Sequence, residues 1–193
     1  MIEKCANIIA DWLINCKVVE ETDKELYSYA VYSILLSLSP LALAIGFGIC
    51  MGCVGQSITI IIPFAIIRKF SGGYHTKHSW SCLIWSSLLL LLCIIVSFCV
   101  KCGWKIALIT VGAAVSLILN SPIDNVNRKL GWEEYLRYKK ITTVLVTIFV
   151  FTAVLLFECR LYTYSICISI GIMLSAGLQL PCIFKKMRRI FVK

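Results

Sequence analysis

SWSCLIWSSLLLLLCIIVSFCV, residues 79–100, carries no charged side chain. A helix needs about 20 mostly apolar residues to cross the hydrocarbon core of a bilayer, so this stretch is long enough for one span. Four more charge-free runs lie at residues 26–67, 106–123, 141–157 and 161–184. The 193-residue chain is 60% hydrophobic and only 15% charged, which is too much apolar surface for a soluble globule of this size to bury. The sequence therefore predicts an all-α, polytopic integral membrane protein.

The run at 26–67 is long enough for two spans. We expect its break at Gly52–Ser57, where two glycines and polar side chains interrupt the apolar pattern. Six transmembrane helices are thus expected, near residues 27–53, 56–70, 80–100, 104–120, 141–157 and 162–184. Three of them contain a proline that should kink the helix, namely Pro40, Pro63 and Pro181. We expect one membrane-embedded domain over residues 1–193, with the bundle at 26–184 and a basic tail at 185–193.

The first 25 residues differ from the rest, because they hold six acids and three lysines. They lack the apolar core of a cleaved signal peptide. Placed on a helix, their apolar residues fall close to one face: Ile2, Ile8, Ile9, Trp12, Leu13 and Cys16. The segment is expected to be an amphipathic helix that lies on the membrane surface.

The distribution of lysine and arginine predicts the orientation. With six spans, 16 of these residues fall on the side of the two termini, and only Lys101, Lys105 and Arg160 fall on the other side. Because an excess of basic residues marks the cytoplasmic side, both termini should be cytoplasmic in a multi-pass protein of the cell membrane.

The same charges leave two interpretations of the net charge of +9 open. In the first, the basic residues only set the topology and attract anionic membrane lipids. In the second, they also bind an acidic peptide. Nucleic acid is not an expected partner, because no stacking aromatics interleave with the basic clusters. The candidate peptide-binding residues are Arg128, Lys129, Lys139, Lys140, Lys185 and Lys186.

Most of the eleven cysteines lie in or beside the apolar runs, where cysteine behaves as a small hydrophobic residue rather than as half of a disulfide. Cys50 and Cys53 form a C-x-x-C pair, but it has no second ligand pair and no nearby histidine. We therefore expect no metal site and no cofactor.

Cys82 has a different context, in the stretch RKFSGGYHTKHSWSC at residues 68–82. A thiolate nucleophile needs a base within hydrogen-bond reach, and both histidines of the chain, His75 and His78, precede Cys82 here. The four-residue spacing favours His78 if a helix begins that early, whereas the turn-forming Ser71–Gly73 indicates a later start. From spacing alone, a loop with incidental histidines is an equal alternative.

Two motifs resemble the accessory gene regulator B (AgrB) family of Gram-positive bacteria. They are R-x-x-S-G-G-x-H, with a cysteine seven residues beyond the histidine, and SPIDNVNRKL at residues 121–130. Members are membrane-embedded cysteine endopeptidases that process quorum-sensing pro-peptides. The resemblance extends to length, spans, cytoplasmic termini and basic tail. It implies an AgrD-like precursor whose acidic tail is removed and whose central segment is cyclised to a thiolactone or lactone, and it implies a homodimer.

The resemblance makes Cys82 the nucleophile and His75 the general base, with His78 outside the motif. Arg68, Gly72 and Gly73 match the family's arginine and glycine pair. Backbone N–H groups around the two glycines, or the Arg68 guanidinium, are candidates to stabilise the oxyanion, although Arg68 also suits a side chain that reaches from a span end to the interface. Asp124 either orients His75 or caps the loop beside Pro122.

A transporter or channel, or a non-catalytic membrane scaffold, is the alternative. A pathway could use the polar residues Gln56, Asn120 and Gln179. The spans contain no acid or base at mid-membrane, which ion and proton pathways usually need.

Overall fold

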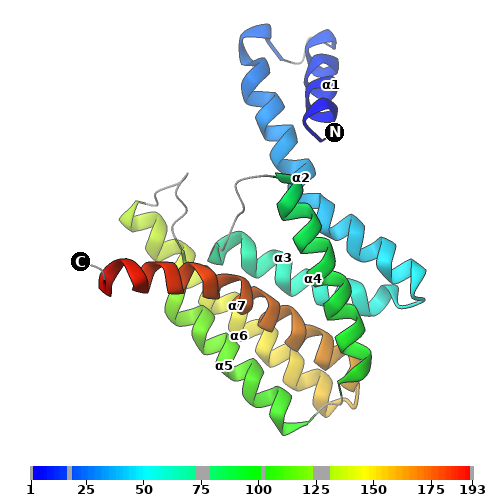
Figure 1. Ribbon diagram of the computed structural model, residues 1–193, viewed down its shortest axis with the longest axis vertical. Coiled ribbons are helices and arrows are strands. Elements are labelled where there is room, and N and C mark those ends of the chain that lie inside the picture. The colour runs from blue at the N-terminus through cyan, green and yellow to red at the C-terminus, as the bar shows by residue number, and fades with distance from the viewer. Residues whose placement is uncertain (1, 17–18, 73–78, 101–102, 124–130, 192–193) are drawn as a thin grey trace. The chain divides into compact units, whose positions relative to one another are not determined.

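A computed structural model describes residues 2–16, 19–72, 79–100, 103–123 and 131–191 (Figure 1). Within these ranges the chain is helical and has no strand, which confirms the all-α prediction. The chain divides into two compact units, Met1–Leu43 and Ala44–Lys193, which we describe separately. The expectation that residues 1–193 work as one membrane domain stays a prediction.

Seven α-helices and one short 3₁₀ helix make up the described ranges. They are α1 (Ile2–Asn15), η1 (Glu21–Asp23), α2 (Lys24–Cys50), α3 (Val54–Ser71), α4 (Ser79–Cys99), α5 (Trp104–Asn120), α6 (Trp132–Glu158) and α7 (Tyr162–Phe191). Each of the six expected spans overlaps one of the helices α2 to α7. The break between α2 and α3 falls at residues 51–53, where Gly52 has a φ of +66°, a conformation that glycine adopts without strain.

Three described helices are long and apolar enough to cross a membrane: Val54–Ser71, Trp132–Glu158 and Tyr162–Cys182. Shorter apolar helical segments lie at Leu41–Cys50, Ser87–Cys99 and Trp104–Asn120. The chain is thus a membrane protein with at least three candidate spans, and the number six stays a prediction.

Helix α7 is the centre of the second unit, because it packs against α3, α5 and α6 and to a lesser extent against α4. A buried apolar cluster joins these helices through Ile67, Leu117, Val146 and Ile172. At Gly171 the backbones of α3 and α7 approach closely: a Cβ there would lie 2.6 Å from the Ile60 carbonyl oxygen. Small residues at helix contacts are typical of membrane bundles, in which close van der Waals packing drives association.

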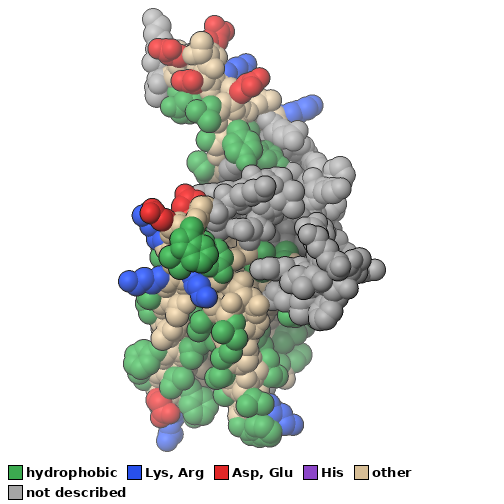
Figure 2. Space-filling model, turned by 90° about the vertical axis from the view of Figure 1, so that its left-hand side faces the viewer, with side chains coloured by type: hydrophobic (Ala, Val, Ile, Leu, Met, Phe, Trp, Pro, Cys, Tyr) green, Lys and Arg blue, Asp and Glu red, His purple; other side chains and the backbone are tan. Residues whose placement is uncertain are grey.

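The outside of the second unit is apolar along the middle of its helices. Leu88, Leu108 and Phe151 are among many exposed hydrophobic side chains. On the face shown in Figure 2, hydrophobic side chains extend along the second unit and charged side chains gather toward its ends. Helix α6 follows this pattern, with charges before residue 141 and at Glu158 but none between. Such a surface suits a lipid environment around the middle of the helices.

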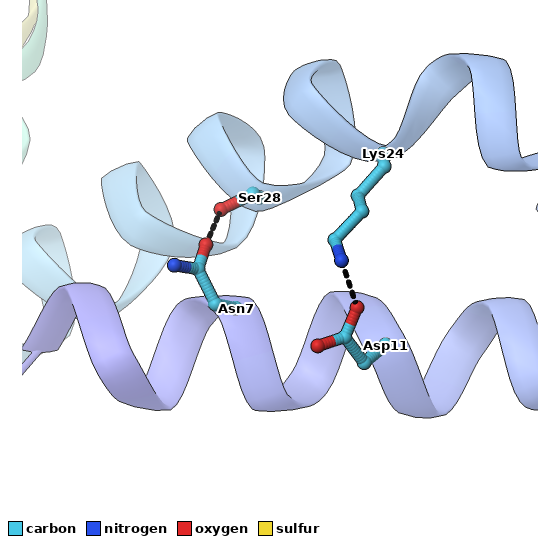
Figure 3. Close-up of polar contacts among 4 residues, drawn as sticks. All are labelled: Asn7, Asp11, Lys24 and Ser28. Atoms are coloured by element: carbon cyan, nitrogen blue, oxygen red, sulfur yellow. Dashed lines mark hydrogen bonds and ion pairs between the residues drawn. The ribbon is translucent and has the colours of Figure 1, made fainter.

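In the first unit, two polar contacts join α1 to the start of α2 (Figure 3). The Ser28 hydroxyl donates to Asn7 Oδ1, and Lys24 Nζ lies 2.5 Å from Asp11 Oδ1. In α1, Asp11 comes four residues after Asn7, whereas its partner Lys24 comes four residues before Ser28 in the chain. The two helices therefore run antiparallel here. The bond to Asp11 and the charge of that carboxylate raise the pKa of Lys24, although so exposed an ion pair stabilises the fold little.

The apolar face expected on α1 points away from these contacts. Ala6 and Ala10 are buried, whereas Ile8 and Trp12 are 67% and 62% exposed. The structure has a helix at Ile2–Asn15, shorter than the expected 25-residue segment, and its exposed apolar side chains suit contact with lipid headgroups and acyl chains. Its position on the membrane surface stays a prediction.

Candidate functional site

The first motif begins in the last turn of α3 and passes through its end. Helix α3 ends at Ser71, and the Gly72 N–H donates to the Arg68 carbonyl at 3.2 Å. Gly72 has a φ of +72° and a ψ of −166°, a backbone conformation that essentially only glycine adopts. The motif glycine is therefore the residue that ends the helix, close to the expected end of the second span at residue 70.

The second motif meets this helix end through the backbone. The Ile123 N–H donates to the Ser71 carbonyl at 3.0 Å. A Cβ at Gly72 would lie only 2.7 Å from the Ile123 carbonyl oxygen, so only a residue without a side chain allows this approach. The start of SPIDNVNRKL thus lies directly against the S-G step of the first motif. The sequence analysis did not predict this contact.

A third segment joins them from α7. Gln179 is fully buried, and its Nε2 donates to Ser121 Oγ at 2.9 Å and to the Ser71 carbonyl at 3.2 Å. Ser71 and Ser121 are 1% and 0% exposed. We call this group of five residues the junction: Ser71, Gly72, Ser121, Ile123 and Gln179. Sequence reasoning singled out Gln179 as a polar residue in an apolar span, but for a pathway and not for this site.

The start of α6 lies at the same end of the second unit as the junction. The rings of Phe70 in α3 and Tyr138 in α6 are 6.0 Å apart between centroids. Lys139 and Lys140 follow Tyr138 directly and are half-buried and exposed, respectively. Two of the expected basic residues are therefore on the helix turn that packs against the end of α3.

Arg68 is half-buried near the junction, and its Cζ lies 5.6 Å from the centre of the Phe64 ring. A guanidinium over an aromatic face gains a cation–π attraction and stays charged. This position is compatible with both roles expected for Arg68, namely stabilising the oxyanion and reaching from the end of a span to the membrane interface.

Several expected site residues lie outside the described residues. They are Gly73, His75 and His78 in 73–78, and Asp124, Arg128 and Lys129 in 124–130. The side chains of Lys185 and Lys186 in α7 and of Cys82 in α4 also lie outside them. Cys82 is the fourth residue of the described part of α4, Ser79–Cys99, and the residues directly before it lie outside the described ranges. The helix start later than the histidines, which the turn at Ser71–Gly73 indicated, stays a prediction.

The polar residues expected for a transport pathway do not converge on one described cavity. Gln56 lies in the first turn of α3, at the end opposite to Ser71, and lines a pocket of about 510 Å³ with Ser97 and Tyr162. Asn120 is exposed and donates to the Ser116 carbonyl of its own helix. Among the described residues, no three His, Cys, Asp or Glu side chains gather as metal ligands.

Comparisons with known proteins agree with the two motifs. The family model for accessory gene regulator B matches residues 3–181 of this chain. A protein of Clostridium perfringens (strain 13 / Type A), AgrB-like protein 2 by name, is 23% identical over 167 residues, covering 80% of this chain and 77% of the relative. No solved structure matches. Since the family model spans nearly the whole sequence and both motifs that meet at the junction, the chain belongs to the accessory gene regulator B (AgrB) family.

Proposed function

We propose that this protein is a membrane-embedded cysteine endopeptidase that removes the acidic tail of an AgrD-like precursor and promotes its cyclisation. Family membership supports a role in the processing of quorum-sensing peptides. The observation that carries the proposal is the backbone contact of Ser71 with Ile123, which joins the motif that leads to His75 and Cys82 to the motif that leads to Asp124. Tail release from a precursor in vesicles, measured by mass spectrometry with and without Cys82, tests the assignment.

The described backbone supports the roles of Cys82 and His75. We also propose that the helix of Cys82 begins after the histidines, which places Cys82 in its first turn, where the partial positive charge of a helix N-terminus favours a thiolate. His75 is four residues beyond Ser71, so chain length alone keeps its Cα within about 14 Å of the junction. Asp124 follows Ile123 directly, which makes it a candidate to orient the imidazole from the other motif.

The proposed reaction has two acyl transfers and consumes no water. The Cys82 thiolate attacks the scissile carbonyl carbon while His75 holds the proton that it took from the thiol. The C–N bond then breaks, His75 gives its proton to the leaving amine, and the acidic tail departs from an acyl-thioester on Cys82. A thiol of the same peptide gives its proton to His75 and attacks the thioester carbonyl; the C–S bond to Cys82 then breaks, Cys82 leaves as a thiolate, and a thiolactone ring forms. Cyclisation is favoured because the attacking thiol is tethered and has a high effective concentration.

The proposed topology has six spans, both termini in the cytoplasm and α1 on the inner membrane surface. Single cysteines in a cysteine-free background should react with a membrane-impermeant maleimide in intact cells at Lys105 and Arg160. Cysteines at Lys139 and Lys140 should react only after the cells are opened, since basic residues stay on the cytoplasmic side. Labelling at Lys140 in intact cells would exclude this orientation.

We also propose that the basic start of α6 attracts the acidic tail. The double substitution Lys139→Gln, Lys140→Gln should raise the KM for the precursor about three- to tenfold with little change in kcat, because it removes attraction before the chemical step. The matched control is Lys105→Gln, Arg160→Gln, which removes two exposed charges at the other end of the helices. The difference in KM between the Lys139→Gln, Lys140→Gln variant and the unsubstituted protein should become smaller at high salt, which screens exposed charges. If both double variants have the same KM at low salt, Lys139 and Lys140 contribute to the membrane topology and do not attract the acidic tail.

A further inference from the structure

We propose that Gln179 is a positioning residue for this reaction: it ties the ends of the two segments that lead to His75 and Asp124. The inference rests on the proposed function and adds a residue that lies outside both motifs, 108 positions from Ser71 and 58 positions from Ser121. Gln179 would act through the backbone at the junction rather than by touching the substrate.

The orientation of the Gln179 amide follows from its partners. The Ser71 carbonyl oxygen only accepts hydrogen bonds, so the atom 3.2 Å away must be the donating nitrogen and not the amide oxygen. The amide nitrogen has two hydrogens, and its two partners, the Ser71 carbonyl and Ser121 Oγ, occupy both. No hydrogen remains for an oxyanion, which excludes Gln179 as an oxyanion donor while these bonds persist.

The Ser71 carbonyl belongs to the last residue of α3, where helix carbonyls lack partners within their own helix. Two donors reach it from other segments, namely the Ile123 N–H and Gln179 Nε2. Buried hydrogen bonds of this kind are costly to break, because the freed groups find no water. Ser71, four residues before His75, and Ile123, the residue before Asp124, are therefore held by one buried network.

Stability alone gives a weak reason for a glutamine at this position. Its Oε1 is buried without a hydrogen-bond partner among the described residues, which is unfavourable. A leucine of similar size would remove that cost in an apolar span, and Ser71 would still accept from Ile123. What the leucine could not do is join Ser71 to Ser121. The side chain is thus better explained by the link between segments than by packing.

The test compares Gln179→Leu with Gln56→Leu in vesicles, at equal amounts of inserted protein. Gln56 is a matched control, since its Oε1 is also buried without a partner among the described residues but it lies at the other end of α3. We expect Gln179→Leu to lower kcat at least tenfold with KM within about twofold, because small displacements of catalytic groups cost up to about 10²-fold in rate. Gln56→Leu should keep both constants within about twofold.

Gln179→Glu supplies a readout that a purely structural role would not move. A neutral carboxyl at this position can still donate one hydrogen bond to the Ser71 carbonyl. Once ionised it cannot donate. The kcat of Gln179→Glu relative to the unsubstituted protein should therefore fall as pH rises, whereas the same ratio for Gln179→Leu should be flat.

A kcat for Gln179→Leu equal to that of Gln56→Leu would overturn the positioning role, as would a pH-independent ratio for Gln179→Glu. If Gln179→Leu does not insert, Ser121→Ala carries the same test, since it removes one of the two acceptors. A smaller loss of kcat at constant KM is then expected, and an unchanged kcat overturns the proposal. Cleavage that persists in Cys82→Ala would instead contradict the proposed function, so the two failures are distinguishable.

Discussion

Cys82→Ala and His75→Ala are each expected to abolish release of the acidic tail. Without the thiol no acyl-enzyme forms, and without the base the thiol has to lose its proton unaided, which costs about 10²- to 10⁴-fold in rate. Because the two groups act as a unit, the double variant should be little worse than Cys82→Ala alone. The measurement is tail release in vesicles at equal amounts of inserted protein, followed by mass spectrometry.

His78→Ala is the matched control, three residues from His75. It should cleave at close to the rate of the unsubstituted protein. A precursor that lacks its cyclising thiol should leave a thioester adduct on Cys82, with the mass of the acyl segment, and no adduct on the Cys82→Ala variant. An inactive His78→Ala together with an active His75→Ala would show that the four-residue spacing identified the base and the family motif did not.

Gly72→Ala is expected to damage both stability and activity. A side chain at φ +72° costs about 1–2 kcal/mol. The new Cβ would also stand 2.7 Å from the Ile123 carbonyl oxygen, a backbone atom that cannot turn aside. The end of α3 and the Ser121–Ile123 segment would have to separate, which breaks the bond of Ser71 to Ile123. We expect a lower unfolding free energy and at least a tenfold loss of kcat.

The control for this change is Gly112→Ala in α5, where an added Cβ would have no atom within 4 Å. Alanine is the better helix former, so this variant should be as stable as the original or slightly more stable. Unfolding in detergent and tail release in vesicles measure the two effects. If Gly72→Ala and Gly112→Ala have the same unfolding free energy and the same rate of tail release, the close approach of Gly72 to Ile123 contributes to neither stability nor activity.

The positions of the helices could be predicted from hydropathy, because a helix that crosses lipid needs apolar side chains along its whole span. The expected span at 80–100 became α4 at Ser79–Cys99, and the one at 104–120 became α5 at Trp104–Asn120. The start of α6 was missed by nine residues, since the expectation began at 141 and the helix begins at Trp132. Residues 132–140 are too charged for the bilayer core, but charge does not prevent a helix from continuing into water.

The sequence was sufficient to recognise the two motifs of the candidate site, but not to predict that they lie in contact. The residue types in R-x-x-S-G-G-x-H and SPIDNVNRKL indicate the family, but the contact between the two motifs is made by the backbone of Ser71 and Ile123, and a backbone contact cannot be recognised from residue types. Gln179 did carry a signal, since an amide in an apolar span needs partners. Its partners, a carbonyl and a serine more than fifty residues away, could not be read from that signal.

The apolar segment of α7 predicts the depth of the junction in a bilayer. Its 30 residues extend about 45 Å, whereas a hydrocarbon core is about 30 Å thick. With the apolar segment Tyr162–Cys182 matched to that core, Gln179 lies three residues, or about 5 Å, inside its edge. The helix continues past that edge toward the headgroups. At this depth a peptide lying among the headgroups is within a few ångströms, while the density of water is already falling. If the proposed thioester on Cys82 forms at this depth, it should meet a tethered thiol more often than water, which is the condition for making a ring rather than a hydrolysed chain.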